Sequence, residues 1–440
     1  MTETRAQFVW LSRPGTDAPA GAVGMPLADT VYWERPSRRP DRRQLFAPAP
    51  DWADDLQRVA RAVFAADRCA NRADFFDHWT RRIDLSVPVT DPGRWNRALP
   101  ALTALLGTVT GDRWEVRFRP MDEQSLRREP FTFSAEQYAR EVALFSGGLD
   151  SLGWAAQRAT VRSPRALLLV TFEERNFEAV QDHVYEAVYG LRERPLRRLD
   201  QSQTVRAPKG SGIKPDRSTR SRGLLYAATA VHAAAAERVP VVHLPENGQL
   251  ALNPPLSAAR AGACSTRSVH PWTLYQLNRV IAEVAGADDA VRVENPFAAL
   301  TKGEVCAAAR DSGVPQEVLE ATLSCGASPV HQPNGPDIAH CGLCYPCLVR
   351  RSGLLHAFGE DRTPYAAAPW DPALPADRTD HWRALRRWLD VDCTVLDLVA
   401  DAPLPPDARP ARLLEVVERG REELRAMVGW VDGVAARKAS

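Results

Sequence analysis

Residues 142–151 read VALFSGGLDS, and this stretch decides the fold. Its first four residues form a short apolar run typical of a buried strand, and the pattern turns helical after Ser151. Between strand and helix lies the glycine loop, Ser146-Gly147-Gly148-Leu149-Asp150-Ser151. Its two glycines permit backbone angles that let successive N–H groups face one anion, and Asp150 and Ser151 favour a helix start. The loop predicts a pyrophosphate site, with an ordinary strand–helix turn as the alternative. Because the chain has no Gly-Lys dipeptide, a Walker A loop is excluded.

Further apolar runs at 165–172 and 239–245 predict two more buried strands. Helical patterns at 178–191 and 223–237 lie between them. Strands that alternate with helices of this length predict an α/β fold built on a parallel sheet. Such sheets bind ligands at the carboxyl ends of their strands, which is where the glycine loop begins.

The regions on either side of this pattern have a different character. Residues 1–138 contain short β-type runs and one helical pattern, which predict an α+β accessory domain. Residues 139–358 form the central domain, and 359–440 form a mostly helical C-terminal extension with apolar residues at helical spacing from 409 onward.

Four of the eight cysteines lie between positions 325 and 347, namely Cys325, Cys341, Cys344 and Cys347. Two overlapping C-x2-C steps bring three thiolates to one ion, and Cys325 supplies a fourth across a loop. Four thiolates saturate tetrahedral Zn²⁺, so the spacing predicts a structural zinc subdomain. His331 or His340 replacing one cysteine, an Fe–S cluster, and unliganded thiols are the alternatives.

Composition limits the class of protein. The 440 residues are 45% hydrophobic and 25% charged, and Lys+Arg 56 against Asp+Glu 55 leaves a net charge of +1. This balance gives no reason to expect direct nucleic-acid binding. With no apolar run of membrane-spanning length and no secretory signal, we expect a cytoplasmic protein with no membrane partner. Homo-oligomerisation stays open.

The glycine loop resembles the PP-loop of ATP pyrophosphatases, and together with the cysteine spacing it resembles the 7-cyano-7-deazaguanine synthase (QueC-like) family. The resemblance implies an adenine nucleotide alpha hydrolase-like fold and an ATP-dependent C–N ligase, forming AMP and pyrophosphate from a 7-carboxy-7-deazaguanine-type acid. It also implies Mg²⁺ with the ATP. The glycine loop would bind the nucleotide, and Arg222 matches an arginine that opens a helix after a mobile loop. Lys302 matches a lysine that approaches the nucleotide and is one of only four lysines in the chain. Asp150, Ser151 and Lys302 are therefore the predicted catalytic residues.

The chain departs from the family between 245 and 271, where we expect a variant substrate loop. Glu246 and Asn247 offer polar groups for a purine-like ring, and Arg267 and His270 for a carboxylate or phosphate. Each also fits an ordinary turn or loop. The basic segment 201–222 predicts a lid over the triphosphate, with a solvated loop as its alternative.

The added terminal regions resemble the expanded branch of the family found in bacterial anti-phage gene clusters such as the Qat system. This implies a role in antiviral defence, with an amine of a partner protein as acceptor and an amide as product. A housekeeping nitrile synthase, another PP-loop enzyme that modifies tRNA, and a non-catalytic nucleotide-binding scaffold are the alternatives.

Overall fold

A computed structural model of the chain describes most of its length. The described residues are 5–11, 21–26, 32–34, 45, 47–121, 138–172, 177–201, 203–205, 212–216, 220–254, 256, 267–286, 289–326, 339–400 and 402–439. Across these ranges, no helix has both the length and the apolar character needed to span a bilayer.

The centre of the molecule is a five-stranded sheet in the order β11-β10-β6-β7-β8, and all its strands are parallel. The strands are β6 (Glu141–Leu144), β7 (Leu167–Phe172), β8 (Leu196–Gln201), β10 (Val241–His243) and β11 (Arg292–Glu294). Every residue of β7 is buried, as a central parallel strand covered on both faces requires. The α/β fold and the three predicted strands are confirmed, whereas β8 and β11 were not predicted.

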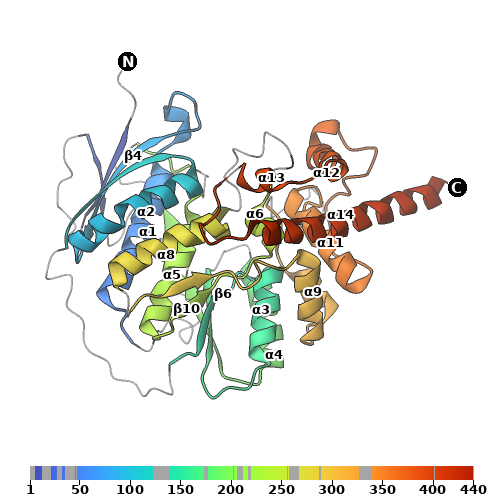
Figure 1. Cartoon of the computed structure of the whole chain (residues 1–440), viewed down its shortest axis with the longest axis horizontal. Helices are drawn as coiled ribbons and strands as arrows, with labels where there is room; N and C mark the ends of the chain where they lie inside the picture. The colour runs from blue at the N-terminus through green and yellow to red at the C-terminus, as the bar shows by residue number, and fades with distance from the viewer. Residues whose placement is uncertain are drawn as a thin grey trace.

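Helices cover both faces of this sheet (Figure 1). Side chains of β7 alternate between two hydrophobic cores: Leu168 and Val170 pack in the core that contains α5, and Leu167 and Leu169 in the core that contains α3 and α4. The helices are α1 (Asp51–Cys69), α2 (Pro92–Thr110), α3 (Leu149–Ala159), α4 (Glu178–Leu191), α5 (Arg222–Ala236), α6 (Gly248–Leu252), α8 (Pro271–Ala285), α9 (Lys302–Asp311), α10 (Gln316–Ala321), α11 (Tyr345–Phe358), α12 (Asp380–Asp390), α13 (Val395–Val399) and α14 (Pro410–Ala439).

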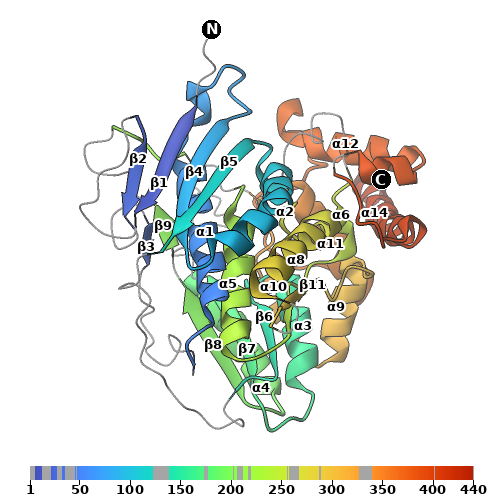
Figure 2. The same ribbon diagram turned by 60° about the vertical axis from the view of Figure 1, so that its left-hand side comes forward.

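The N-terminal region forms a second sheet, visible beside the first in Figure 2. Its strands follow the order β2-β1-β4-β5 and are β1 (Ala6–Leu11), β2 (Val23–Pro26), β4 (Arg82–Val89) and β5 (Arg113–Pro120). All pairings are parallel, with α2 crossing from β4 to β5. The α+β prediction for this region is therefore wrong, because a helical crossover between parallel strands is the α/β arrangement.

The two sheets belong to one folded body. A single hydrophobic core runs from Trp10 through α1 and α2 to Val242 and Val293 of the central sheet. In addition, β3 (Tyr32–Glu34) pairs antiparallel with β9 (Gln203–Val205), which joins the N-terminal region to the segment that follows β8.

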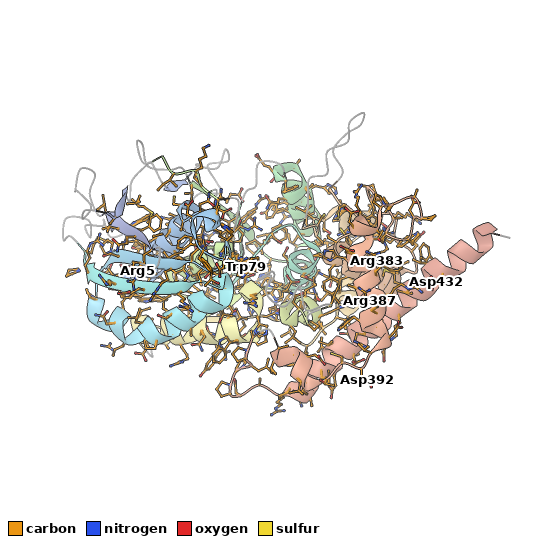
Figure 3. All side chains as sticks on the ribbon, turned by 90° about the horizontal axis from the view of Figure 1, so that it is seen from above. Arg5, Trp79, Arg383, Arg387, Asp392 and Asp432 are labelled. Atoms are coloured by element: carbon orange, nitrogen blue, oxygen red, sulfur yellow. The ribbon has the colours of Figure 1, made fainter. Side chains whose placement is uncertain are left out.

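The C-terminal helices form a further layer, and they share its core with α6 and α11. Trp382, Leu385 and Trp388 of α12 pack there with α11 and α14. In Figure 3, Arg383, Arg387 and Asp432 of these helices lie at the end of the molecule away from Arg5 of the N-terminal region. The helical pattern predicted from 409 onward is confirmed as α14.

Candidate functional site

The glycine loop joins the carboxyl end of β6 to the start of α3, as the sequence predicts. Gly147 has a φ of 78°, and a Cβ placed on it would lie 3.1 Å from Cγ of Gln181. Within the loop, the Gly148 N–H donates to Oγ of Ser146 at 3.2 Å, and Oγ of Ser146 lies 3.2 Å from Oγ of Ser151. The N-cap residue of α3 is Gly148, which has no side chain to cap the helix. The backbone N–H groups of the first turn of α3 are therefore suited to binding an anion.

Gln181 on α4 fixes the backbone of this loop from behind. Its amide nitrogen donates to the carbonyl oxygens of Ser146 at 3.1 Å and Phe172 at 3.0 Å. Gln181 was not predicted from the sequence. The signal was weak, since it consisted of one polar residue on the otherwise apolar, buried face of an amphipathic helix.

Four polar side chains meet at the start of α3, and we call them the ionic cluster: Asp150, Glu246, Asn247 and Lys302. Nζ of Lys302 lies 2.5 Å from Oδ2 of Asp150, and only 3% of the Lys302 side chain is exposed. The Asn247 amide donates to the same Asp150 oxygen at 3.2 Å and to Glu246 Oε1 at 2.9 Å. Residues from three distant parts of the chain therefore surround Asp150, and only 8% of its side chain is exposed.

Charge in the ionic cluster is divided unequally between the two carboxyl groups. Burial raises the pKa of Asp150, but the Lys302 ammonium and the hydrogen bonds from Glu246 and Asn247 outweigh this and hold it below its ordinary value. Burial and the adjacent Asp150 carboxylate raise the pKa of Glu246 well above its ordinary value. Burial opposes the charge of Lys302, yet the two acids keep its pKa raised. Within the cluster the charged form is therefore favoured for Asp150 and Lys302 and disfavoured for Glu246.

Local structure places Lys302 at this position. It is the first residue of α9, and Thr301 and Glu304 form a reciprocal capping box around it. Gly353 of α11 allows the lysine to pass, because a Cβ on Gly353 would lie 2.6 Å from Cγ of Lys302. Any larger residue at 353 would displace the lysine stem.

A cavity of about 330 Å³ opens beside the glycine loop at the carboxyl ends of β6 and β7. Phe172 and Tyr226 stack in its wall with ring centroids 3.9 Å apart, and Arg222 lies 5.8 Å from the centre of the Tyr226 ring. Ser146 and Cys325 line the same cavity. It therefore combines an aromatic wall, a cation and the glycine loop, which are features suited to a nucleotide.

The four cysteines predicted as a zinc site are brought together. Their sulfurs all lie within 4.8 Å of one another, with 4.0 Å between Cys325 and Cys344 and 3.9 Å between Cys341 and Cys347. Thiolates around tetrahedral zinc stand about 3.8 Å apart, given Zn–S bonds near 2.3 Å. Four sulfurs so close cannot all ionise without a cation, so the cluster has the chemistry and spacing to hold zinc. His340 is not part of this group, and its ring packs against Tyr365. His331 lies outside the described residues.

The cysteine cluster also braces the glycine loop. Leu323, two residues before Cys325, donates its N–H to the carbonyl oxygen of Gly147 at 3.4 Å. Arg350 is fully buried and donates to Thr322 at 2.8 Å and to the carbonyl oxygens of Leu319 and Glu320. Arg350, which follows the cysteines, therefore fixes the segment after α10. This segment contacts the glycine loop through Leu323 and leads to Cys325 of the cysteine cluster.

The predicted substrate residues separate into two pairs. Glu246 and Asn247 belong to the ionic cluster, whereas Arg267 and His270 make contacts elsewhere. Among the described residues, none of the four lines the cavity beside the glycine loop. Arg267 donates to the carbonyl oxygen of Thr108 at 3.0 Å. His270 is the N-cap of α8 and accepts from the Trp272 N–H. Much of the predicted lid (206–211 and 217–219) and of the substrate loop (255 and 257–266) lies outside the described residues.

Residues 271–358, about one fifth of the chain, match the sequence model of a protein family described as "Queuosine biosynthesis protein QueC". The match runs from the first residue of α8 to the last residue of α11 and contains Lys302 and the whole cysteine cluster. It supports a QueC-like relationship and ATP-dependent PP-loop chemistry related to 7-cyano-7-deazaguanine synthesis. Neither the curated proteins nor the solved structures include a match to the chain.

Proposed function

We propose that the protein is an ATP-dependent ligase that adenylates the carboxylate of a 7-carboxy-7-deazaguanine-type acid and transfers the acyl group to an amine. One observation carries this proposal. Lys302, which lies within the QueC-matched segment, contacts Asp150 of the glycine loop, which lies outside it. A lysine of the QueC-matched segment and an aspartate of the glycine loop thus form one site.

ATP would bind across the glycine loop and the cavity. The backbone donors of the loop and the N-terminus of α3 suit the phosphates, and the Phe172–Tyr226 wall suits the adenine ring. Arg222 at the cavity edge would contact either the phosphates or the ring face.

The ionic cluster also fits a magnesium ion accompanying ATP. Oδ1 of Asp150 is buried and has no hydrogen-bond partner among the described residues, and Glu246 supplies a second carboxyl group beside it. Asp150 and Glu246 would hold the ion, which when bound neutralises charge on the phosphates. A bound cation would oppose the rise in the pKa of Glu246, because a nearby positive charge favours the carboxylate.

The reaction follows from this arrangement. A carboxylate oxygen of the acid attacks the α-phosphorus, and the bond to the β-phosphate breaks to release pyrophosphate. The amine then attacks the carbonyl carbon, the bond to AMP breaks, and the nitrogen loses a proton to give the amide. Lys302 and the loop N–H groups stabilise the charge that develops on the phosphates.

We further propose that the acceptor is an amine of a partner protein and that the reaction serves antiviral defence. The proposal rests on the resemblance to the expanded branch and on the large N-terminal and C-terminal regions, which provide surface for docking a macromolecule. A substituted amide on a polypeptide cannot be dehydrated to a nitrile, so the reaction would stop there. Ammonia as acceptor, giving the free nitrile, is the competing outcome. The cytoplasmic location stays an expectation.

Pyrophosphate release tests the adenylation. Purified protein with ATP, Mg²⁺ and the deazaguanine acid should release pyrophosphate and AMP only when the acid is present. Asp150→Ala should reduce the rate by about 10²–10³-fold, whereas Asp390→Ala, an exposed acid on α12, should leave it unchanged. Binding of ATP without acid-dependent release would instead indicate the nucleotide-binding scaffold.

Mass spectrometry of the products tests the acceptor. The reaction is run with ammonia or with the products of neighbouring genes, and both small molecules and intact proteins are weighed. A mass increase on a partner protein supports conjugation. Efficient formation of free nitrile with no protein adduct would contradict it and leave the adenylation proposal intact.

A further inference from the structure

One face of the C-terminal helix α14 is packed against the segments that build the ionic cluster. Val416, Arg419, Gly420 and Glu423 recur at helical spacing, so they lie on the same side of the helix. All four contact either α6, which follows Glu246 and Asn247, or the start of α9. This helix lies outside the QueC-matched segment.

Glu423 and Arg419 fix the start of α9 around Lys302. The buried Glu423 carboxylate accepts from the hydroxyl of Thr301 and from the N–H of Gly303 at 3.0 Å. Arg419 donates to Glu304 at 2.8 Å. The residues immediately before and after Lys302 are therefore both hydrogen-bonded to one side chain of α14.

The contact between α14 and α6 is equally close. A Cβ on Gly420 would lie 2.6 Å from Oε1 of Gln249, which is itself buried and bonded to the Tyr345 hydroxyl. On the other side, a Cβ on Gly248 would collide with the carbonyl oxygen of Ala298 and approach Val416 to 2.9 Å. The helix therefore holds α6 and α9 in fixed relation to each other.

We propose that α14 completes the active site and that Glu423 is a positioning residue for Lys302. A lysine side chain is long and flexible, so its approach to Asp150 depends on where the first residue of α9 is held. A displacement of about 1 Å at this point would separate Nζ from the Asp150 carboxylate and weaken catalysis. The catalytic part of this inference rests on the proposed function, whereas the placement of Lys302 does not.

Chemical labelling of lysine tests the placement without requiring activity. The chain has four lysines, of which Lys302 is buried and Lys214 is exposed, so acetylation can be followed at each by peptide mass spectrometry. In the unaltered protein we expect Lys302 to be labelled far more slowly than Lys214. Glu423→Ala should raise the labelling rate of Lys302 about tenfold or more and leave that of Lys214 unchanged.

Two further variants separate positioning from general damage. Glu423→Gln should keep Lys302 protected, because its carbonyl can accept from Gly303 and its amide can donate to Thr301. Glu422→Ala, at the exposed neighbouring position, should behave like the unaltered protein. If Glu423→Ala does not fold, as judged by circular dichroism, then Arg419→Ala is used and should also increase the labelling of Lys302.

The same variants are then assayed for pyrophosphate release. Glu423→Ala should lower kcat about tenfold with KM for ATP changed less than about twofold, and Glu423→Gln should restore most of the rate. Lys302 that stays protected in Glu423→Ala, or becomes equally exposed in Glu422→Ala, would overturn the proposal. If Lys302 loses its protection in Glu423→Ala but the unaltered protein shows no ATP turnover, the proposed function is refuted and the positioning role of Glu423 is still supported.

Discussion

Replacing Lys302 with methionine tests how charge is balanced in the ionic cluster. Methionine keeps an unbranched stem of similar length but removes the ammonium group that lies 2.5 Å from Asp150. Two carboxyl groups, the buried Asp150 and the half-buried Glu246, then remain without this cation. Removing one partner of a buried ion pair costs about 3–5 kcal/mol of folding free energy when the other charge stays.

Part of this loss should depend on pH. In the unaltered protein the pKa of Asp150 is lowered, so its contribution to stability is fully present between pH 6 and 8. Without Lys302, burial should outweigh the hydrogen bonds from Glu246 and Asn247 and raise the pKa of Asp150 above its unfolded value. A group with a raised folded pKa contributes stability that is lost as pH rises through that pKa. The destabilisation should therefore be about 3–5 kcal/mol at pH 8 and smaller at pH 6.

The measurement is urea unfolding followed by tryptophan fluorescence at pH 6, 7 and 8 with zinc present. Lys302 opposes the rise in the pKa of Glu246, so its removal shifts Glu246 in the same direction as Asp150 and adds to the same pH trend. Lys214→Met, at an exposed lysine, is the control and should show a small loss that does not change with pH. A large loss for Lys302→Met that is equal at all three pH values would refute the assignment of Lys302 as the cation that keeps Asp150 ionised.

Three other outcomes are expected. Ser151→Ala should slow pyrophosphate release by about tenfold or more with the fold intact, because it removes a hydroxyl from the glycine loop; a normal rate would remove Ser151 from the catalytic residues. Cys344→Ser should lower the zinc content below one ion per chain and reduce the melting temperature, since metal binding supplies folding energy. Elemental analysis of the unaltered protein that shows iron, or no metal, would contradict the zinc site. Ser221→Ala should lower the free energy of unfolding in urea by about 1–2 kcal/mol, because the Ser221 hydroxyl donates to the buried Asp67 carboxylate at 2.6 Å and links the N-terminal region to the start of α5. An unchanged urea midpoint would show that this hydrogen bond contributes no stability.

The sequence by itself determined the features that depend on local pattern. The apolar run before Ser146 and the glycines after it predict a strand, a tight loop and a helix, and the structure has all three. The cysteine spacing predicts a single cluster, because C-x2-C steps bring sulfurs together within one turn of chain. Helix α14 was visible as apolar residues at helical spacing.

Other features could not be read from a local pattern. The strand β8 has the sequence LRRLDQ, which lacks the apolar pattern of a buried strand. Arg198 and Asp200 can be buried in it because they form an ion pair with each other inside the fold. The parallel direction of β4 and β5 depends on how α2 packs, and a sequence window does not contain that information.

The ionic cluster was decided by tertiary structure alone. Asp150, Glu246 and Lys302 were each identified from the sequence for separate reasons, as a loop residue, a candidate for the substrate and a match to a family lysine. Nothing in the sequence said that they share one buried environment, because their segments are far apart in the chain and meet only at the carboxyl edge of the sheet. The contribution of Glu423 was invisible for the same reason. A glutamate on an amphipathic helix looks like a solvated side chain until packing removes it from water and places it against the N-terminus of α9, where a carboxylate finds unsatisfied backbone donors.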